Sequence, residues 1–110
     1  MPHSEIAVIP LSGDLTSTSD GTHGAELARA GAFVILDLRD VEWVESVGIG
    51  FLVQAIAERR DQGGEVVLAS ARPRVARLLA QMGITGNLCR IFDTNEAARR
   101  HLERRASDGA

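Results

Sequence analysis

One serine of this chain lies in a context that suits reversible chemistry. Ser46 is followed by Gly48 and Gly50, and this Ser-x-Gly-x-Gly run opens a segment whose apolar residues recur at helical spacing. The Ser46 hydroxyl can cap that helix by accepting a hydrogen bond from a first-turn N–H group. A phosphate on the same hydroxyl would also be supported, because a helix start favours negative charge. The residues alone leave both interpretations open, a structural cap or a phosphorylated serine.

The glycines after Ser46 open the helix start to another molecule. Because Gly48 and Gly50 carry no side chains, a partner can approach the backbone there closely. The buried stripe of the helix is predicted at Ile49, Leu52, Val53 and Ile56. The predicted partner-binding face, which includes the Ser46 turn and the helix side away from that stripe, consists of Glu45, Ser46, Val47, Gly48, Gly50, Phe51, Gln54 and Glu58.

Other readings of this segment are weaker, and we expect no enzyme and no cofactor. A nucleophile elbow, Gly-x-Ser-x-Gly, would need glycine at position 44, where Val44 stands. A dinucleotide fingerprint would need a third glycine at position 53, where Val53 stands. No nucleophile–base pair is visible either, so the sequence predicts no catalytic residue.

Metal binding is also not expected. The carboxylates before Ser46 are interpreted as a solvated acidic rim, since they fall in a strand and the turn that should follow it: Asp37, Asp40, Glu42 and Glu45. The histidines share no ligand spacing with one another or with Cys89: His3, His23 and His101. Cys89 is interpreted as a small core side chain.

Two further features have two interpretations each. Trp43 either anchors a binding interface, where aromatic side chains concentrate binding energy, or packs under the turn before Ser46. The last predicted helix carries a basic patch of four arginines: Arg99, Arg100, Arg104 and Arg105. The default interpretation of this patch is a solvated helical face, and the second interpretation is a contact with a partner.

The elements that position these residues alternate between strand and helix, which predicts an α/β fold with a short, mostly parallel sheet flanked by about four helices. Strands are expected at 6–9, 33–38, 65–69 and 88–92, with turns at 11–19 and after 38. Helices are expected at 21–30, at 48–62, from Pro73 to Gly83 with Ser70 as cap, and from a capping box at Asp93–Glu96 to about 105. The buried stripe of the third helix is predicted at Val75, Leu78, Leu79 and Met82.

Length and composition limit the organisation and the class of partner. The 110 residues fit one domain, with a core over about 6–105 and a flexible tail at 106–110. The net charge of −3 argues against nucleic-acid binding. Cys89 is the single cysteine, and the chain lacks both a signal-peptide pattern and an apolar run of membrane-spanning length. We therefore expect a cytoplasmic protein that does not insert into a membrane.

The run Val-Ile-Leu-Asp-Leu-Arg-Asp-Val-Glu-Trp-Val-Glu-Ser-Val-Gly-Ile-Gly, residues 34–50, resembles the signature of bacterial STAS-domain anti-sigma factor antagonists. That signature is a hydrophobic strand, Asp-Leu, and then Asp-Ser-Ser/Thr-Gly-Leu-Gly. Further pieces match in order at 11–15, 63–68, 73–79, 82–84 and 92–97, so the resemblance covers about 6–102. It implies a single STAS-like domain. Two departures are Glu45 in place of the usual aspartate and Val47 in place of the second hydroxyl residue.

The resemblance also implies a function. The position that matches the family's phosphorylated serine is Ser46. The unphosphorylated protein would bind an anti-sigma factor that has a histidine-kinase-like ATPase fold and acts as a serine kinase. Phosphorylation would release it, and a phosphatase would restore it. Two alternatives stay open: an accessory subunit that clamps the ATPase of an ABC lipid transporter, and a component of a stress-sensing scaffold.

Overall fold

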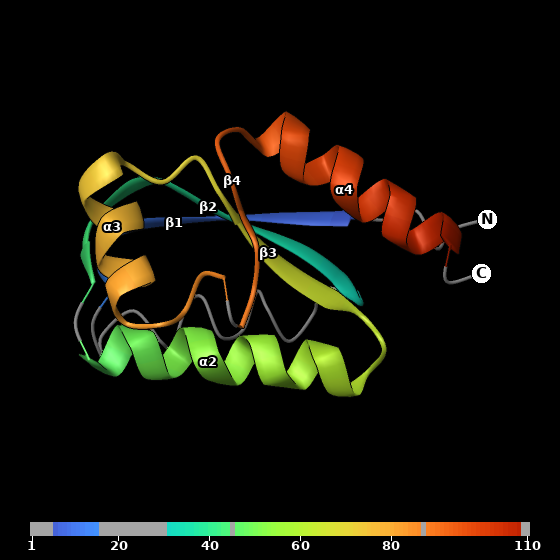
Figure 1. The fold of residues 1–110 in the computed structure, drawn as a ribbon, viewed down its shortest axis with the longest axis horizontal. Coiled ribbons are helices and arrows are strands. Elements are labelled where there is room, and N and C mark those ends of the chain that lie inside the picture. Colours follow the sequence, from blue (N-terminus) through green and yellow to red (C-terminus); the bar gives the residue numbers. More distant parts are fainter. Residues whose placement is uncertain (1–5, 16–30, 45, 87, 109–110) are drawn as a thin grey trace.

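The computed structural model describes residues 6–15, 31–44, 46–86 and 88–108. Their elements are β1 (Ile6–Leu15), β2 (Phe33–Val44), α2 (Ser46–Asp61), β3 (Glu65–Ala69), α3 (Pro73–Gln81), β4 (Ile91–Phe92) and α4 (Asn95–Asp108). The strands form one parallel sheet in the order β1-β2-β3-β4 (Figure 1). The predicted α/β fold with a parallel sheet is confirmed. Of the four expected helices, the one predicted over 21–30 lies outside the described residues.

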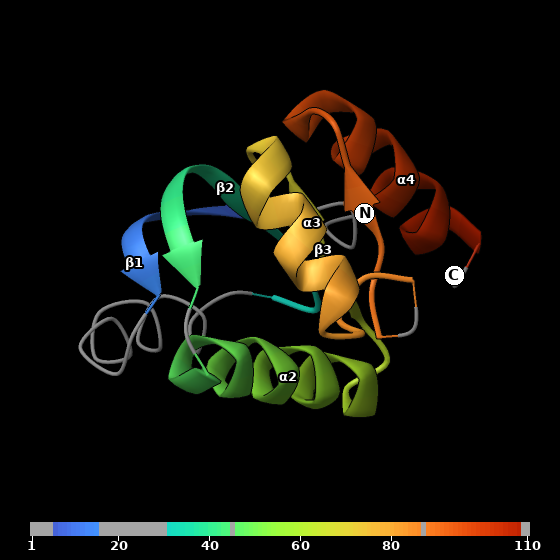
Figure 2. The same cartoon turned by 60° about the vertical axis from the view of Figure 1, so that its left-hand side comes forward.

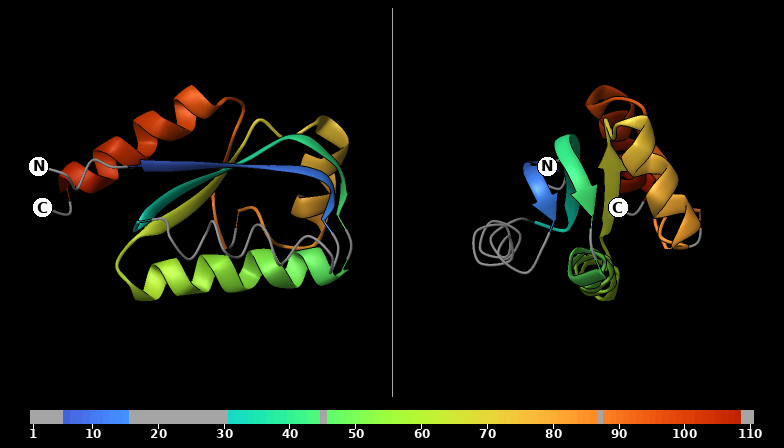
Figure 3. Two further views of the ribbon diagram at one scale, coloured as in Figure 1. Left: turned by 180° about the vertical axis from the view of Figure 1, so that it is seen from behind. Right: turned by 90° about the vertical axis from the view of Figure 1, so that its left-hand side faces the viewer.

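The sheet is buried on both faces, which explains the continuous apolar runs of its central strands. Side chains alternate across β2 and β3, so that neighbours in sequence enter different cores. Val34, Leu36 and Leu68 pack with α2 and α3 in the larger core. Ile35 and Val67 pack with α4 in the smaller core. The view from behind and the end-on view in Figure 3 show α2 and α4 on either side of the strands.

Both long strands extend beyond their predicted ends. The polar turn expected after residue 38 is wrong, because β2 continues to Val44 with Val41 buried and its neighbours exposed. The turn expected at 11–19 is wrong for 11–15, which continue β1. Register shifts between Pro10 and Ser12, and between Gly13 and Asp14, keep this polar segment paired with β2. Pro10 is tolerated because β1 is the edge strand of the described sheet.

Glycines end the two helices of the larger core, as predicted. Gly63 has a φ of 81°, and the amides of Gly63 and Gly64 donate to the carbonyls of Arg60 and Arg59 at 3.0 and 2.8 Å. This pattern is a Schellman motif, in which glycine takes the left-handed position after the helix. Gly83, with a φ of 77°, occupies the same position after α3. Because this motif ends α2, β3 can begin directly after Gly64, at Glu65.

Several helix and strand details differ from expectation. Met82 is 46% exposed and Val53 38% exposed, so neither belongs to the buried stripe predicted for its helix. Only Ile91–Phe92 of the strand predicted at 88–92 forms a ladder, and an isolated bridge joins Thr85 to Cys89.

The last helix also differs from its predicted bounds. The Thr94 hydroxyl, not the Asp93 carboxylate, caps α4 by accepting from the Ala97 amide at 3.1 Å. The helix continues to Asp108, through residues expected in a flexible tail, because Ala106 is buried. Within the described segments, no helix combines the length and the apolar character needed to cross a bilayer.

Candidate functional site

Ser46 lies at the start of α2, two residues after the end of β2. Val44, the last residue of β2, is buried, and α2 begins at Ser46, two residues before its predicted start. The first turn of α2 contains no acidic residue. Its N-terminal amides and positive dipole end are therefore not neutralised by a carboxylate within that turn. A phosphate at this position would meet favourable backbone electrostatics.

The predicted partner-binding face can be placed in part. Gly50, Gln54 and Glu58 are exposed and four residues apart, so they form one line along α2. Gln54 Nε2 donates to Glu58 Oε2 at 3.3 Å within that line. The structure describes the backbone of Ser46, Val47, Gly48 and Phe51 in α2 but not the side chains of Ser46, Val47 and Phe51, and Glu45 lies outside the described residues.

The opposite side of α2 is buried, with one unexpected member. Leu52, Ala55 and Ile56 pack against the sheet in the larger core. Arg59 is only 3% exposed, although we had not assigned it to the core. Its spacing of seven residues from Leu52 places it on the buried side, and that spacing is the signal that the sequence offered.

Trp43 lies at the surface beside the end of β2. Its side chain is 40% exposed, and the Arg74 guanidinium lies 5.5 Å from the ring centroid. A cation over an aromatic face is attracted by the ring quadrupole. Arg72 Nε donates to the Arg39 carbonyl at 3.0 Å and so ties the start of α3 to β2. Figure 2 shows α3 beside the end of β2, which descends toward the start of α2. Trp43 is therefore an exposed aromatic near the Ser46 turn.

A chain of polar side chains joins β2, β3 and α4 at the carboxyl edge of the sheet. Asn95 Nδ2 donates to Asp37 Oδ2 at 3.0 Å, and the Ser70 hydroxyl donates to Asn95 Oδ1 at 2.8 Å. Asp37 Oδ1 also accepts from the Arg39 amide at 2.9 Å. Asp37 is half-buried and is therefore not part of the solvated rim that we expected, whereas Asp40 and Glu42 are exposed.

Ser70 is not the helix cap that we expected. Arg72 occupies the cap position of α3, and no side chain caps that helix. Ser70 instead has a φ of 63°, a left-handed conformation that is rare for residues other than glycine. The Ser70 amide donates to the Phe92 carbonyl at 3.0 Å, and its hydroxyl holds Asn95. These two bonds explain why a serine adopts this conformation here.

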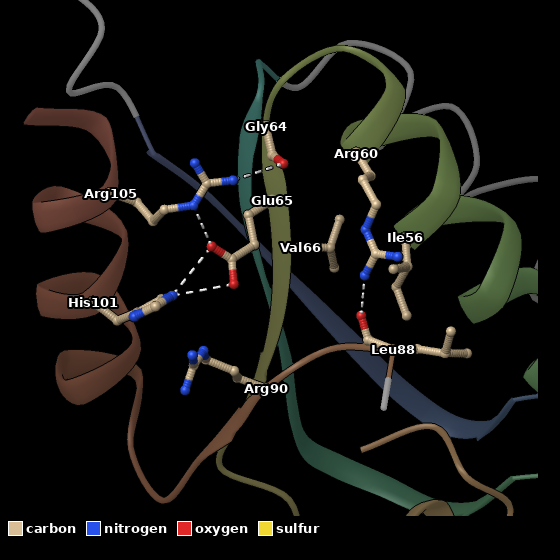
Figure 4. A pocket seen from close by; sticks show the side chains of 9 residues that line it. All are labelled: Ile56, Arg60, Gly64, Glu65, Val66, Leu88, Arg90, His101 and Arg105. Atoms are coloured by element: carbon tan, nitrogen blue, oxygen red, sulfur yellow. Dashed lines mark hydrogen bonds and ion pairs between the residues drawn. The ribbon is translucent and has the colours of Figure 1, made fainter. Parts of the chain in front are cut away.

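A second charged site lies at the other end of α2. Glu65 accepts from Arg105 Nε at 3.0 Å, and His101 Nε2 lies 3.1 Å from both Glu65 carboxylate oxygens (Figure 4). Arg105 also donates to the Gly64 carbonyl at 3.4 Å. All four arginines of the predicted basic patch are exposed, but Arg105 is tied to β3 through Glu65, and Arg100 lies 3.9 Å from Glu96 within α4. No pattern in the sequence predicted the contact between Glu65 and α4.

Cys89 and the potential metal ligands are the remaining reactive groups among the described residues. Cys89 is buried, and that burial is the main cause that raises the pKa of its thiol to about 11. Such a thiol is a poor nucleophile at neutral pH. Among the described residues, no group of three or more histidine, cysteine or acidic side chains could hold a metal ion.

Solved structures share this arrangement of strands and helices. A sulfate transporter family protein from Wolinella succinogenes matches with a TM-score of 0.81 and 17% identity, over 93% of this chain and 88% of that chain. A putative anti-sigma factor antagonist from Thermotoga maritima matches with a TM-score of 0.74 and 22% identity, over 94% and 100%. The anti-sigma factor antagonist SpoIIAA in its unphosphorylated form matches with a TM-score of 0.74 and 19% identity, over 94% and 93%. At these identities the likenesses show a common fold.

A comparison with curated proteins finds no match. The family of this chain is shown instead by a comparison with family models. A family model described as STAS domain matches residues 3–98, which is most of the chain and includes β1 to β4, α2, α3 and the start of α4. The chain therefore belongs to the STAS domain family.

Proposed function

We propose that this protein is an anti-sigma factor antagonist that works by partner switching. In this account it is a binding module without catalytic activity and acts in the cytoplasm. The unphosphorylated form binds an anti-sigma factor with a histidine-kinase-like ATPase fold. That partner phosphorylates Ser46, the complex separates, and a phosphatase resets the protein.

One observation carries the proposal: Ser46 is the first residue of α2 and heads a line of exposed positions. Gly50, Gln54 and Glu58 continue that line as exposed positions, and Gly50 itself carries no side chain. Trp43, 40% exposed, adds an aromatic group at the end of the strand that leads to Ser46. Partners that bind such a surface would cover Ser46 or its immediate surroundings.

The physical basis of release is the asymmetry between the free protein and the complex. A phosphate adds about −1.5 to −2 charges at neutral pH. On the free helix start this charge is mildly favourable, by up to about 1 kcal/mol. In a closely fitted interface the same charge must lose its hydration, and Glu45 beside it adds repulsion. Phosphorylation should therefore weaken binding without unfolding the domain.

The proposal is tested with the anti-sigma factor of the source organism and ATP. We expect one phosphate on the protein, located at Ser46 by peptide mass spectrometry. The neighbouring Val47 cannot accept a phosphate, which makes the assignment clear. A phosphate found elsewhere, or none, would count against partner switching through Ser46.

A second candidate is a domain that serves a membrane transporter. It is favoured by the likeness to the Wolinella succinogenes sulfate transporter family protein and to a SulP transporter STAS domain from Vibrio cholerae. In that case affinity purification from the source cell would recover a transporter subunit. Recovery of a kinase-like anti-sigma factor would support the first proposal instead.

A further inference from the structure

A pocket with an excess of positive charge lies along the open edge of β3. It has a volume of about 260 Å³ and is bounded by the end of α2, by β3 and by α4 (Figure 4). β4 pairs only with Leu68 and Ala69, so it leaves the first half of β3 uncovered on this side. Arg60, which lines the pocket, lies about 21 Å along α2 from Ser46, at 1.5 Å per residue. The pocket is therefore far from the Ser46 turn, and although Glu58 of the proposed partner-binding face is close to Arg60 in sequence, residues two apart do not share a helix face and Glu58 does not line the pocket.

The side chains that line the pocket carry a net positive charge, whereas the whole chain carries a net negative charge. Arg60, Arg90 and Arg105 contribute three positive charges, and Glu65 contributes one negative charge. With His101 neutral, the wall carries a net charge of +2, whereas the chain carries −3. Like charges held near one another repel, and an anion between them would relieve that repulsion.

Hydrogen-bond donors exceed acceptors in the same space. Each guanidinium offers five N–H groups. The two oxygens of Glu65 are already engaged by His101 and Arg105, and Arg60 uses Nη2 on the Leu88 carbonyl at 2.6 Å. The side chain of Arg90 makes no hydrogen bond or ion pair with any residue that the structure describes, and Figure 4 shows its guanidinium turned toward Glu65 and His101.

The backbone of β3 adds a further donor. The amides of Leu68 and Ser70 donate toward the β4 side, to the carbonyls of Arg90 and Phe92. Glu65 donates in the other direction, to the Ala32 carbonyl at 2.9 Å. Alternation along the strand therefore turns the Val66 N–H toward the pocket. A ligand in this space would need to supply acceptor oxygens.

We infer that this pocket binds a phosphate group, either as free phosphate or as a small phosphomonoester. A phosphate group carries about 1.5 to 2 negative charges at neutral pH, which offsets most of the net charge of the wall, and its oxygens suit the planar forks of arginine. Ile56, Val66 and Leu88 form apolar parts of the wall. A neighbouring pocket of about 520 Å³ shares Arg60, Glu65, Leu88 and Arg90, and it leaves room for the carbon skeleton of a phosphomonoester.

The test is titration of the full 110-residue chain with sodium phosphate at constant ionic strength, followed by calorimetry and by amide chemical shifts. We expect saturable binding with a Kd on the order of 1 mM, with shifts centred on the amides of Gly64, Val66 and Arg90. Arg90→Gln should weaken binding about tenfold or more, and so should Arg60→Gln. Arg77→Gln is the matched control, because it removes the same charge from an exposed position on α3.

A parallel titration with glycerol 3-phosphate distinguishes a phosphomonoester from free phosphate as the ligand. Tighter binding of the phosphomonoester assigns the organic ligand, and equal or weaker binding assigns free phosphate. The inference is overturned if phosphate produces no saturable response, or if Arg77→Gln weakens binding as much as Arg90→Gln. Melting of each variant without phosphate shows that the fold is retained. None of these outcomes depends on Ser46.

Discussion

Gly50 is a glycine that the fold itself does not require. It lies in α2, it is exposed, and a Cβ built on it would meet no other atom within 4 Å. A glycine inside a helix costs roughly 0.5–1 kcal/mol of stability relative to alanine. Gly50→Ala should therefore stabilise the free protein by that amount, which raises Tm by about 2–5 °C for a chain of this size. A residue that lowers stability without any packing reason points to a requirement outside the free protein.

That requirement, in our account, is the close approach of the partner to the start of α2. A methyl group at position 50 would stand between the helix backbone and the partner surface. We expect Gly50→Ala to bind the anti-sigma factor about tenfold more weakly, equivalent to about 1.4 kcal/mol. Calorimetric titration measures the affinity, and thermal melting measures the stability of the same sample.

Gly31→Ala is the matched control for this experiment. Gly31 is also exposed, and a Cβ there also meets nothing within 4 Å, but it precedes β2 and so lies at the opposite end of that strand from the start of α2. Its substitution should leave partner affinity unchanged. If Gly50→Ala raises Tm and binds the partner as tightly as the wild type, the glycine does not serve partner approach and the reasoning fails.

Three further substitutions test the fold around the sites. Gly64→Ala should cost more than about 3 kcal/mol in urea unfolding, because its Cβ would lie 1.9 Å from the Ala32 carbonyl oxygen; a cost below about 1 kcal/mol would contradict the close approach. Asn95→Ala should cost about 2 kcal/mol, since it removes the amide that pairs with the half-buried Asp37 carboxylate, and an unchanged Tm would show that this bond contributes nothing. Burial raises the pKa of the Cys89 thiol from 9.0 to about 11, so the folded state keeps a proton that the unfolded chain loses first. The free energy of unfolding should therefore decrease as the pH rises from 9.0 to about 11. Cys89→Ala should remove that decrease, and a decrease that persists in Cys89→Ala would contradict the assignment of the raised pKa to Cys89.

The sheet and its helices could be predicted from local patterns. Continuous apolar runs mark β2 and β3 because both faces of these strands are covered, by α2 and α3 on one side and α4 on the other. The paired glycines at Gly63 and Gly64 predicted the end of α2, since a Schellman motif needs a left-handed residue. In these places the local requirement and the tertiary structure agree.

Predictions failed where distant residues decide the local structure. Serine is a residue type that favours helix caps, yet the hydrogen bond of Ser70 to Asn95, 25 residues away, holds it in a left-handed conformation instead. The polar segment after Pro10 looked like a turn, but pairing with β2 keeps it extended. The candidate pocket is another case, because Glu65 meets His101 and Arg105 only through the packing of α4 on the sheet. Spacing along the chain carries no information about such contacts.

The central claim, that Ser46 controls partner binding from the start of α2, is tested most directly by comparing Ser46→Asp with Ser46→Ala. Each variant is titrated with the anti-sigma factor, and its melting temperature is measured in the same buffer. We predict that Ser46→Asp melts within a few degrees of the wild type and binds at least about tenfold more weakly than Ser46→Ala, a difference of about 1.4 kcal/mol. Equal affinity of the two variants, with both folded, would contradict the account.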